Sequence, residues 1–112
     1  MEKQYDKLVR DNIPNIIKAQ GGIAEIRTLS DDEYTTYLNR KLLEEVNEYL
    51  ENSCIEELCD ILEVIEAIST AKKFSITDIK NVKEAKAHKN GAFKNKILLE
   101  KIIYEGGKTT DR

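Results

Sequence analysis

The sequence predicts a mainly α-helical bundle with a minor pair of β strands. The chain has 112 residues and one proline, Pro14, and no glycine occurs between Gly22 and Gly91. The long middle of the chain is therefore free of the residues that most often break helices. Within it, apolar residues recur at helical spacing, and a serine followed three residues later by an acid occurs at each expected helix start. A helical bundle satisfies both observations.

A short helix is expected near the N-terminus, followed by a strand. Asp11 or Asn12 can cap this helix, and Pro14 suits its first turn. Residues 23–29 then predict a short strand, although apolar and polar residues alternate imperfectly there. Residues 96–104 are rich in branched apolar side chains and are the expected partner strand.

Three longer helices are expected between these strands, each opened by a serine cap and an acid three residues later. Their serine and acid pairs are Ser30 with Glu33, Ser53 with Glu56, and Ser75 with Asp78. The first helix is expected to end near residue 50, the second to cover about 54–72, and the third to stop near residue 90. Because the break between the first two is short, they should form a tight hairpin.

All these elements belong to one predicted domain, residues 1–105, and residues 106–112 are expected to be a disordered tail. A domain of this size buries only a thin core. In addition, Val64 and Ile68 widen the apolar arc of the helix at 54–72 beyond what one neighbouring helix covers. A dimer built on the two hairpin helices is therefore expected.

The composition disfavours nucleic-acid and membrane partners. The formal charge is −3, with 18 basic residues spread among 21 acidic ones, so no basic surface is expected for a nucleic-acid backbone. No signal peptide is expected, and no window approaches the roughly 18 apolar residues of a membrane span. Cys54 and Cys59 are five residues apart in a predicted helix, which disfavours a disulfide and indicates a reducing compartment. A cytoplasmic location is predicted.

Several carboxylates interrupt the apolar surfaces of the predicted hairpin. On a helical wheel, Glu45 falls inside the apolar arc of the first hairpin helix. In the second helix, Glu57 falls between Val64 and Ile68, and Asp60 falls between small residues. Acids in such positions need a group that neutralises them.

The acids are also symmetric about the hairpin turn. Glu48 and Glu57 lie equally far from the turn, as do Glu45 and Asp60, so the four should face one another in two layers. Two carboxylates about 5 Å apart at an effective dielectric near 20 repel by about 3 kcal/mol, which predicts one or two bound cations. Mg²⁺ is the natural candidate because it prefers oxygen ligands, and Mn²⁺ is the alternative. Two simpler interpretations stay open, in which Lys41 neutralises Glu45 or the acids form a solvated helix face.

Four stretches form an ordered set of motifs, namely YDKLVRDNIP (5–14), KLLEEVNE (41–48), EELCD (56–60) and KNGAF (89–93). The two middle stretches resemble the paired ExxE and ExxD motifs of the all-α nucleoside triphosphate pyrophosphohydrolases, the superfamily that includes MazG and phosphoribosyl-ATP pyrophosphohydrolase. The first and last stretches are similar to its small phosphoribosyl-ATP pyrophosphohydrolase-like branch. Together the motifs span most of the chain.

The resemblance implies a MazG-like helical bundle in which Glu45, Glu48, Glu57 and Asp60 coordinate Mg²⁺. It implies hydrolysis of a nucleoside triphosphate to a monophosphate and pyrophosphate, with removal of non-standard nucleotides as one purpose. It also implies a homodimer or a dimer of dimers. Only eight residues separate Glu48 from Glu57, fewer than in the longer members, so a different substrate pocket is expected.

A bound cation would activate a water, with Glu45 or Glu48 as the expected general base. Glu44 lies about 100° further round the helix and is not expected to contribute. Basic side chains are expected on the phosphate oxygens of the nucleotide substrate. The candidates for this role are Arg10, Lys7, Lys41, Lys83, Lys86 and Lys89.

Two other functions stay open on the sequence alone. One is hydrolysis of phosphoribosyl-ATP. The other is a non-catalytic helical module for nucleotide binding or dimerisation, in which the acids are solvated or paired with basic residues. A panel of triphosphates with Mg²⁺, scored for pyrophosphate release, separates these alternatives.

Overall fold

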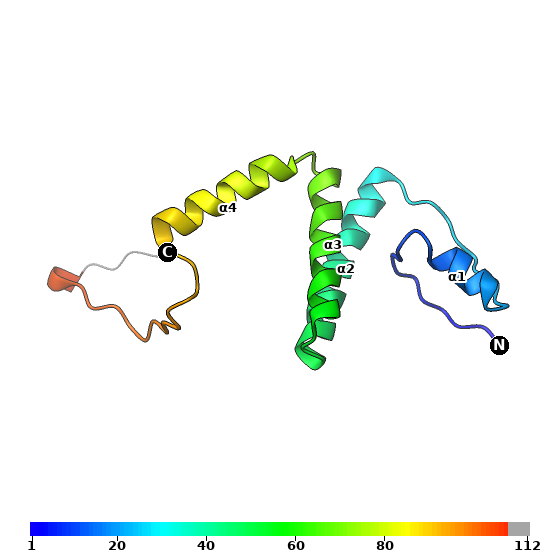
Figure 1. Ribbon diagram of the computed structural model, residues 1–112, viewed down its shortest axis with the longest axis horizontal. Coiled ribbons are helices and arrows are strands. Elements are labelled where there is room, and N and C mark those ends of the chain that lie inside the picture. The colour runs from blue at the N-terminus through cyan, green and yellow to red at the C-terminus, as the bar shows by residue number, and fades with distance from the viewer. Residues whose placement is uncertain (108–112) are drawn as a thin grey trace. The chain divides into compact units, whose positions relative to one another are not determined.

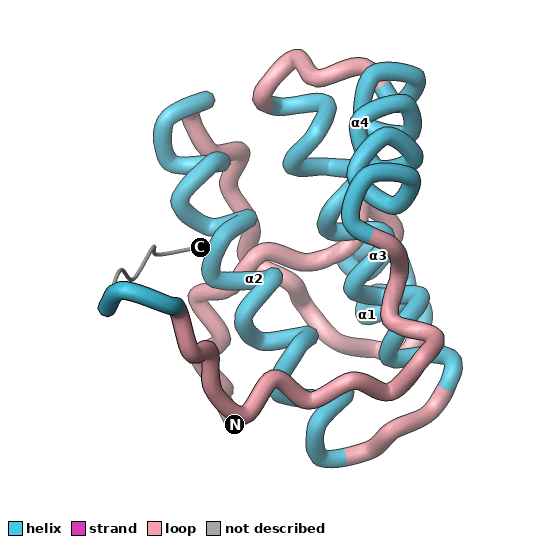
Figure 2. Tube along the Cα trace, turned by 90° about the vertical axis from the view of Figure 1, so that its left-hand side faces the viewer, coloured by secondary structure: helices cyan, strands magenta, loops and turns pink. Residues whose placement is uncertain are grey.

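The computed structural model describes residues 1–107, and within them it is mainly α-helical, as predicted (Figure 1). Its elements are α1 (Ile13–Ala19), α2 (Asp31–Glu51), α3 (Ile55–Ala71), α4 (Ile76–Asn90) and the short 3-10 helix η1 (Glu105–Gly107). The tube in Figure 2 contains no strand over these residues, so the predicted strand pair at 23–29 and 96–104 is not formed. Two isolated strands are marginal in water, and the imperfect alternation of 23–29 offers no continuous apolar face.

The chain divides into two compact units, Met1–Ile79 and Lys80–Arg112. The first contains α1, α2, α3 and the first turn of α4, and all side chains of the candidate site discussed below that interact with one another. The second contains the rest of α4 and η1. The single domain predicted for 1–105 stays a prediction, and the disordered tail predicted for 106–112 lies outside the described residues from 108 onward.

The helix α1 ends where glycine is needed. Gly21 has φ +86°, a left-handed conformation that side chains with a Cβ rarely adopt. Its backbone N–H donates to the Lys18 carbonyl at 3.0 Å, and that of Gly22 donates to the Ile17 carbonyl at 2.9 Å. These two bonds form a Schellman motif that satisfies the last carbonyls of the helix.

The helices α2 and α3 pack side by side as the predicted hairpin (Figure 1). The capping box at the start of α2 is confirmed, because the Glu33 N–H donates to Ser30 Oγ and the Ser30 N–H donates to Glu33 Oε1, each at 3.2 Å. The predicted box at Ser53 is wrong, since α3 begins after Cys54 with no side-chain cap. The Ser53 hydroxyl instead donates to the Tyr49 carbonyl at 3.2 Å, within the last turn of α2.

The two caps give a paired prediction for stability. Ser30→Ala is expected to lower the free energy of unfolding by about 1 kcal/mol, the usual cost of losing an N-cap. Ser53→Ala should change it by much less, because the Ser53 hydroxyl caps no helix and donates to one exposed carbonyl. Urea unfolding of both variants measures the difference, and equal losses would contradict the assignment of the caps.

The hairpin buries Glu45 on its inner side and exposes apolar side chains on its outer side. Among the described residues the buried apolar core consists of Leu38 and Val64. Val64, which the wheel assigned to a dimer face, is thus covered within the chain. Four other residues of α3 fall within an arc of about 80° and are 41–73% exposed. This α3 stripe consists of Ile55, Leu58, Leu62 and Ile65.

No helix within residues 1–107 combines the length and the apolar character that crossing a membrane would require.

Candidate functional site

The site centres on Glu45, a carboxylate of α2 that is only 5% exposed. Its Oε1 lies 3.2 Å from the Lys41 ammonium, one turn earlier on the same helix. Its Oε2 is buried and has no hydrogen-bond partner among the described residues, and the same holds for Oε2 of Glu57 on α3. Burying a carboxylate oxygen without a partner is costly, so these two atoms mark a place where a ligand would relieve the fold.

Two groups of three carboxylates share Glu45. Oxygens of Glu44, Glu45 and Glu48 lie within 4.8 Å of one another, and so do oxygens of Glu45, Glu57 and Asp60. The four acids predicted as metal ligands are therefore brought together. The predicted pairing across the turn is found for Glu45 with Asp60, whereas Glu48 and Glu57 belong to different groups.

Glu44 is a member of the cluster that sequence reasoning excluded. The wheel places it about 100° from Glu45, but it is four residues before Glu48 and three after Lys41, spacings that bring side chains together on one helix face. Its Oε1 lies 2.9 Å from Lys7 Nζ and 3.5 Å from Lys41 Nζ. The i, i+4 spacing to Glu48 was the signal that could have found it.

Three of the predicted phosphate ligands are bound to these acids instead. Lys7 reaches Glu44, and Lys41 bridges Glu44 and Glu45. Arg10 Nη2 donates to Asp60 Oδ1 at 2.7 Å, and its Nη1 donates to Glu63 Oε1 at 3.5 Å. The interpretation in which Lys41 neutralises Glu45 is therefore realised in part, because one oxygen of Glu45 stays without a partner.

Burial dominates the electrostatics of Glu45. It holds the pKa of the Glu45 carboxyl above its ordinary value, and the charge of Glu48 adds to the rise while Lys41 opposes it. Burial acts on Glu44 in the same direction, but the hydrogen bond from Lys7 and the charge of Lys41 outweigh it and lower the pKa of Glu44. The hydrogen bond to Asp60 raises the pKa of Arg10 further above its already high value.

The remaining predicted phosphate ligands, Lys83, Lys86 and Lys89, lie on the part of α4 that belongs to the second unit, and all three are exposed. Their role in binding phosphate stays a prediction. His88 is exposed on the same helix.

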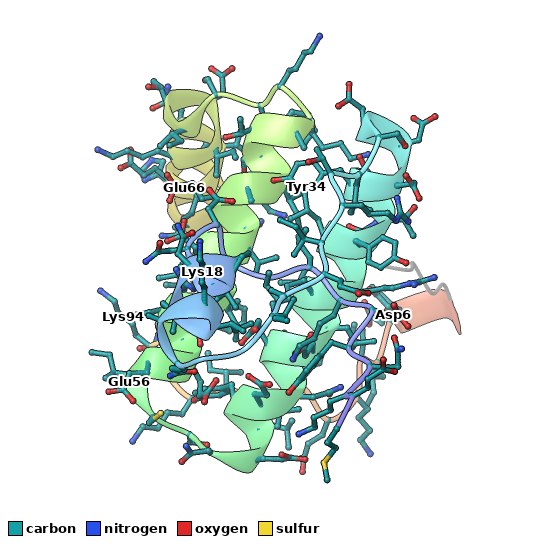
Figure 3. All side chains as sticks on the ribbon, turned by 90° about the vertical axis from the view of Figure 1, so that its right-hand side faces the viewer. Asp6, Lys18, Tyr34, Glu56, Glu66 and Lys94 are labelled. Carbon is teal, nitrogen blue, oxygen red and sulfur yellow. The ribbon has the colours of Figure 1, made fainter. Side chains whose placement is uncertain are left out.

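A shallow hollow of about 290 Å³ lies beside the cluster in the first unit. It is lined by Tyr34, Glu63, Glu66, Ala67, Thr70 and Ala71. Two of these lining residues, Tyr34 of α2 and Glu66 of α3, are labelled in Figure 3. Arg10, which donates to Asp60 of the cluster, also donates to Glu63 in the lining of the hollow, so this one side chain contacts both. The two alanines, seven and eleven residues after Asp60, make the depression because their side chains are small.

Comparison with known proteins does not place the chain in a family. No family model matches it, and no solved structure matches it. Over 42 residues the chain is 60% identical to an uncharacterized protein of Mycolicibacterium smegmatis, and the match covers 38% of this chain and 43% of that protein. The resemblance to the pyrophosphohydrolases therefore rests on the motifs alone.

Proposed function

We propose that the protein is a Mg²⁺-dependent nucleotide pyrophosphohydrolase that cleaves a nucleoside triphosphate to a monophosphate and pyrophosphate. The observation that supports it is the buried carboxylate of Glu45, with one oxygen lacking a partner, at the point shared by two groups of acids. The acidic motifs that carry the family resemblance supply these residues. The purpose of such an activity would be the removal of non-standard nucleotides.

The donor set fits Mg²⁺ or Mn²⁺. All the ligands are carboxylate oxygens, which suit hard cations rather than the sulfur and imidazole sites of zinc. Glu45, Glu48, Glu57 and Asp60 would hold the cation, with Glu44 at the edge of the set. When bound, such a cation neutralises phosphate charge and lowers the pKa of a coordinated water.

The residues of the chain would do the rest of the chemistry. Glu45 or Glu48 would accept the proton of the attacking water, because both carboxylates lie in one group of acids where the cation would bind. Arg10, Lys7 and Lys41 lie at the acids and would meet the phosphate oxygens there.

The hollow beside the cluster would receive the nucleoside part. Along α3, Ala67 is seven residues beyond Asp60, a rise of about 10 Å, so phosphates at the acids leave the base to extend toward the hollow. The Tyr34 ring offers a surface for stacking, and the carboxylates of Glu63 and Glu66 can accept hydrogen bonds from base or ribose N–H and O–H groups.

This placement predicts a substrate-binding defect at Tyr34. Tyr34→Ala is expected to raise KM for the triphosphate by about tenfold, since stacking of a base on an aromatic ring contributes about 1–3 kcal/mol. Tyr34→Phe keeps the ring and should stay within about twofold of the wild type. Steady-state kinetics measures both, and an unchanged KM in the alanine variant would remove the hollow from the site.

The activity itself is tested with a panel of nucleoside triphosphates, modified triphosphates and phosphoribosyl-ATP in millimolar Mg²⁺. Release of pyrophosphate, rather than orthophosphate, is the expected result. Turnover of phosphoribosyl-ATP alone would favour the more specialised hydrolase. Absence of turnover on every substrate would favour the second candidate, a non-catalytic helical module. The ion pairs of Lys7, Arg10 and Lys41 with the acids support this candidate, because in such a module the acids are neutralised by basic residues.

We further infer that two copies of the chain associate through the α3 stripe. Its residues are spaced by three, four and three positions, the pattern that packs one helix against another. On α2, Leu43 and Leu50, seven residues apart, are also exposed. A homodimer or a dimer of dimers would cover both. Cys54 and Cys59 are free thiols, which supports the inference of a cytoplasmic location.

A further inference from the structure

We propose that residues 7–10 form a removable internal counter-cation, which we call the basic strap. In the cation-free protein Lys7 and Arg10 each hold an oxygen of the acidic cluster. Divalent cations entering its two groups of acids displace Lys7 from one group and Arg10 from the other. In its last step the inference rests on the proposed function, because the freed Lys7 and Arg10 then become available to substrate phosphates.

The strap joins the two hairpin helices at the acids. Lys7 Nζ lies 2.9 Å from Glu44 Oε1 on α2, and Arg10 Nη2 lies 2.7 Å from Asp60 Oδ1 on α3. Glu44 and Asp60 belong to different groups of acids, and Glu45 is common to both groups. Each strap residue therefore occupies one group at a position adjacent to the buried carboxylate.

A cation and the strap compete for the same atoms. A divalent cation in either group would draw on Glu44 or Asp60, whose oxygens are the acceptors for Lys7 and Arg10. With the strap in place, the five carboxylates of the two groups lie near three basic side chains, those of Lys7, Arg10 and Lys41. Once the strap leaves, Lys41 is the basic side chain that stays at the acids. The unpartnered Oε2 atoms of Glu45 and Glu57 show that the strap leaves part of the cluster unsatisfied. A cation can satisfy those atoms, which the strap does not reach.

The two strap side chains are more exposed than Lys41, the third basic side chain at the acids. The side chains of Lys7 and Arg10 are 39% and 53% exposed, whereas that of Lys41 is 16% exposed and lies on the same helix as its partners. Exposed ion pairs contribute little, so releasing Lys7 and Arg10 opposes cation binding only weakly. Lys41 is expected to stay in place when the cation enters.

The test uses trypsin, which must take the lysine or arginine side chain into its own pocket. On the full chain, cleavage after Lys7 and after Arg10, followed by mass spectrometry, is expected to accelerate severalfold when millimolar Mg²⁺ is added. Cleavage after Arg27 is the internal control, because Arg27 pairs with Glu33 away from the cluster and should be cut at an unchanged rate. Unchanged or slower cleavage after Lys7 and Arg10 would overturn the proposal.

A second measurement does not depend on proteolysis. Calorimetric titration with Mn²⁺ is expected to show about fivefold tighter binding to Arg10→Gln than to the wild type, the factor that corresponds to a strong exposed ion pair. Lys18→Gln, which removes a charge on α1, is the control and should bind like the wild type. Absence of Mn²⁺ binding, or equal Mn²⁺ affinity in Arg10→Gln and the wild type, would contradict the proposed strap. Release of the strap without pyrophosphate formation would count against the proposed function alone.

Discussion

Glu45→Gln is expected to lower kcat/KM for triphosphate hydrolysis by about 100- to 1000-fold, or about 3–4 kcal/mol of barrier. The substitution keeps the shape of the side chain but removes the carboxylate that both groups of acids share. It also removes one of the two candidate general bases. Pyrophosphate release at saturating Mg²⁺ measures the loss, and a rate equal to that of the wild type would show that Glu45 is not in the active site.

The fold should survive this substitution. Because burial raises the pKa of Glu45, its ionised form costs folding free energy at neutral pH. As pH falls through the raised pKa, the folded protein takes up the proton first and gains stability, and this gain is complete near the ordinary value of 4.5. Glu45→Gln should therefore unfold at a higher urea concentration than the cation-free wild type at pH 7, because relief of the buried charge outweighs the loss of the Lys41 pair.

The matched control is Glu51→Gln, on the exposed last turn of α2. It removes the same charge without touching the cluster, so both the rate and the stabilisation by Mg²⁺ should stay as in the wild type. In Glu45→Gln, the shift of the melting midpoint caused by Mg²⁺ should disappear. A full Mg²⁺ shift in that variant would mean that the cation binds elsewhere.

Much of the hairpin could be predicted from local chemistry. Ser30 and Glu33 cap α2 as expected, and the short break before α3 fixes its antiparallel packing, which brings Glu45 near Asp60. These features depend on residues a few positions apart, where helix geometry gives direct answers. The gathering of the acids followed from the same geometry and needed no long-range information.

Features that depend on competition between partners were harder to predict. The Ser53 side chain could either cap α3 or donate to the Tyr49 carbonyl of α2, and the structure has the second hydrogen bond. The capping-box pattern in the sequence predicts only the first. Likewise, the spacing of Lys7 and Arg10 in the sequence does not predict their partners. Lys7 donates to Glu44 and Arg10 donates to Asp60, each more than 30 residues away in sequence. Such long-range ion pairs follow from the path of the chain, which periodicity does not determine.

The apolar pattern assigned Val64 to a dimer face, but Val64 is buried inside the hairpin. The wheel gives the width of an apolar arc but not which part of it faces α2. In α3 the side that faces α2 carries Glu57 and Val64, which leaves the α3 stripe outside. A stripe that includes Leu62 at 63% exposure is unfavourable in water, and a second helix of the same kind is the partner its spacing fits.

Leu62→Glu is therefore expected to convert the proposed dimer to monomers of 12.9 kDa at micromolar concentration. A symmetric interface loses the side chain twice, and at about 2 kcal/mol for each buried leucine the dissociation constant should rise at least a thousandfold. The added carboxylates weaken association further because they would be buried without partners. Gln4→Glu adds the same charge on the exposed N-terminal segment and should leave the assembly intact. Sedimentation equilibrium measures both variants, and a wild type that sediments as a monomer would refute the interface.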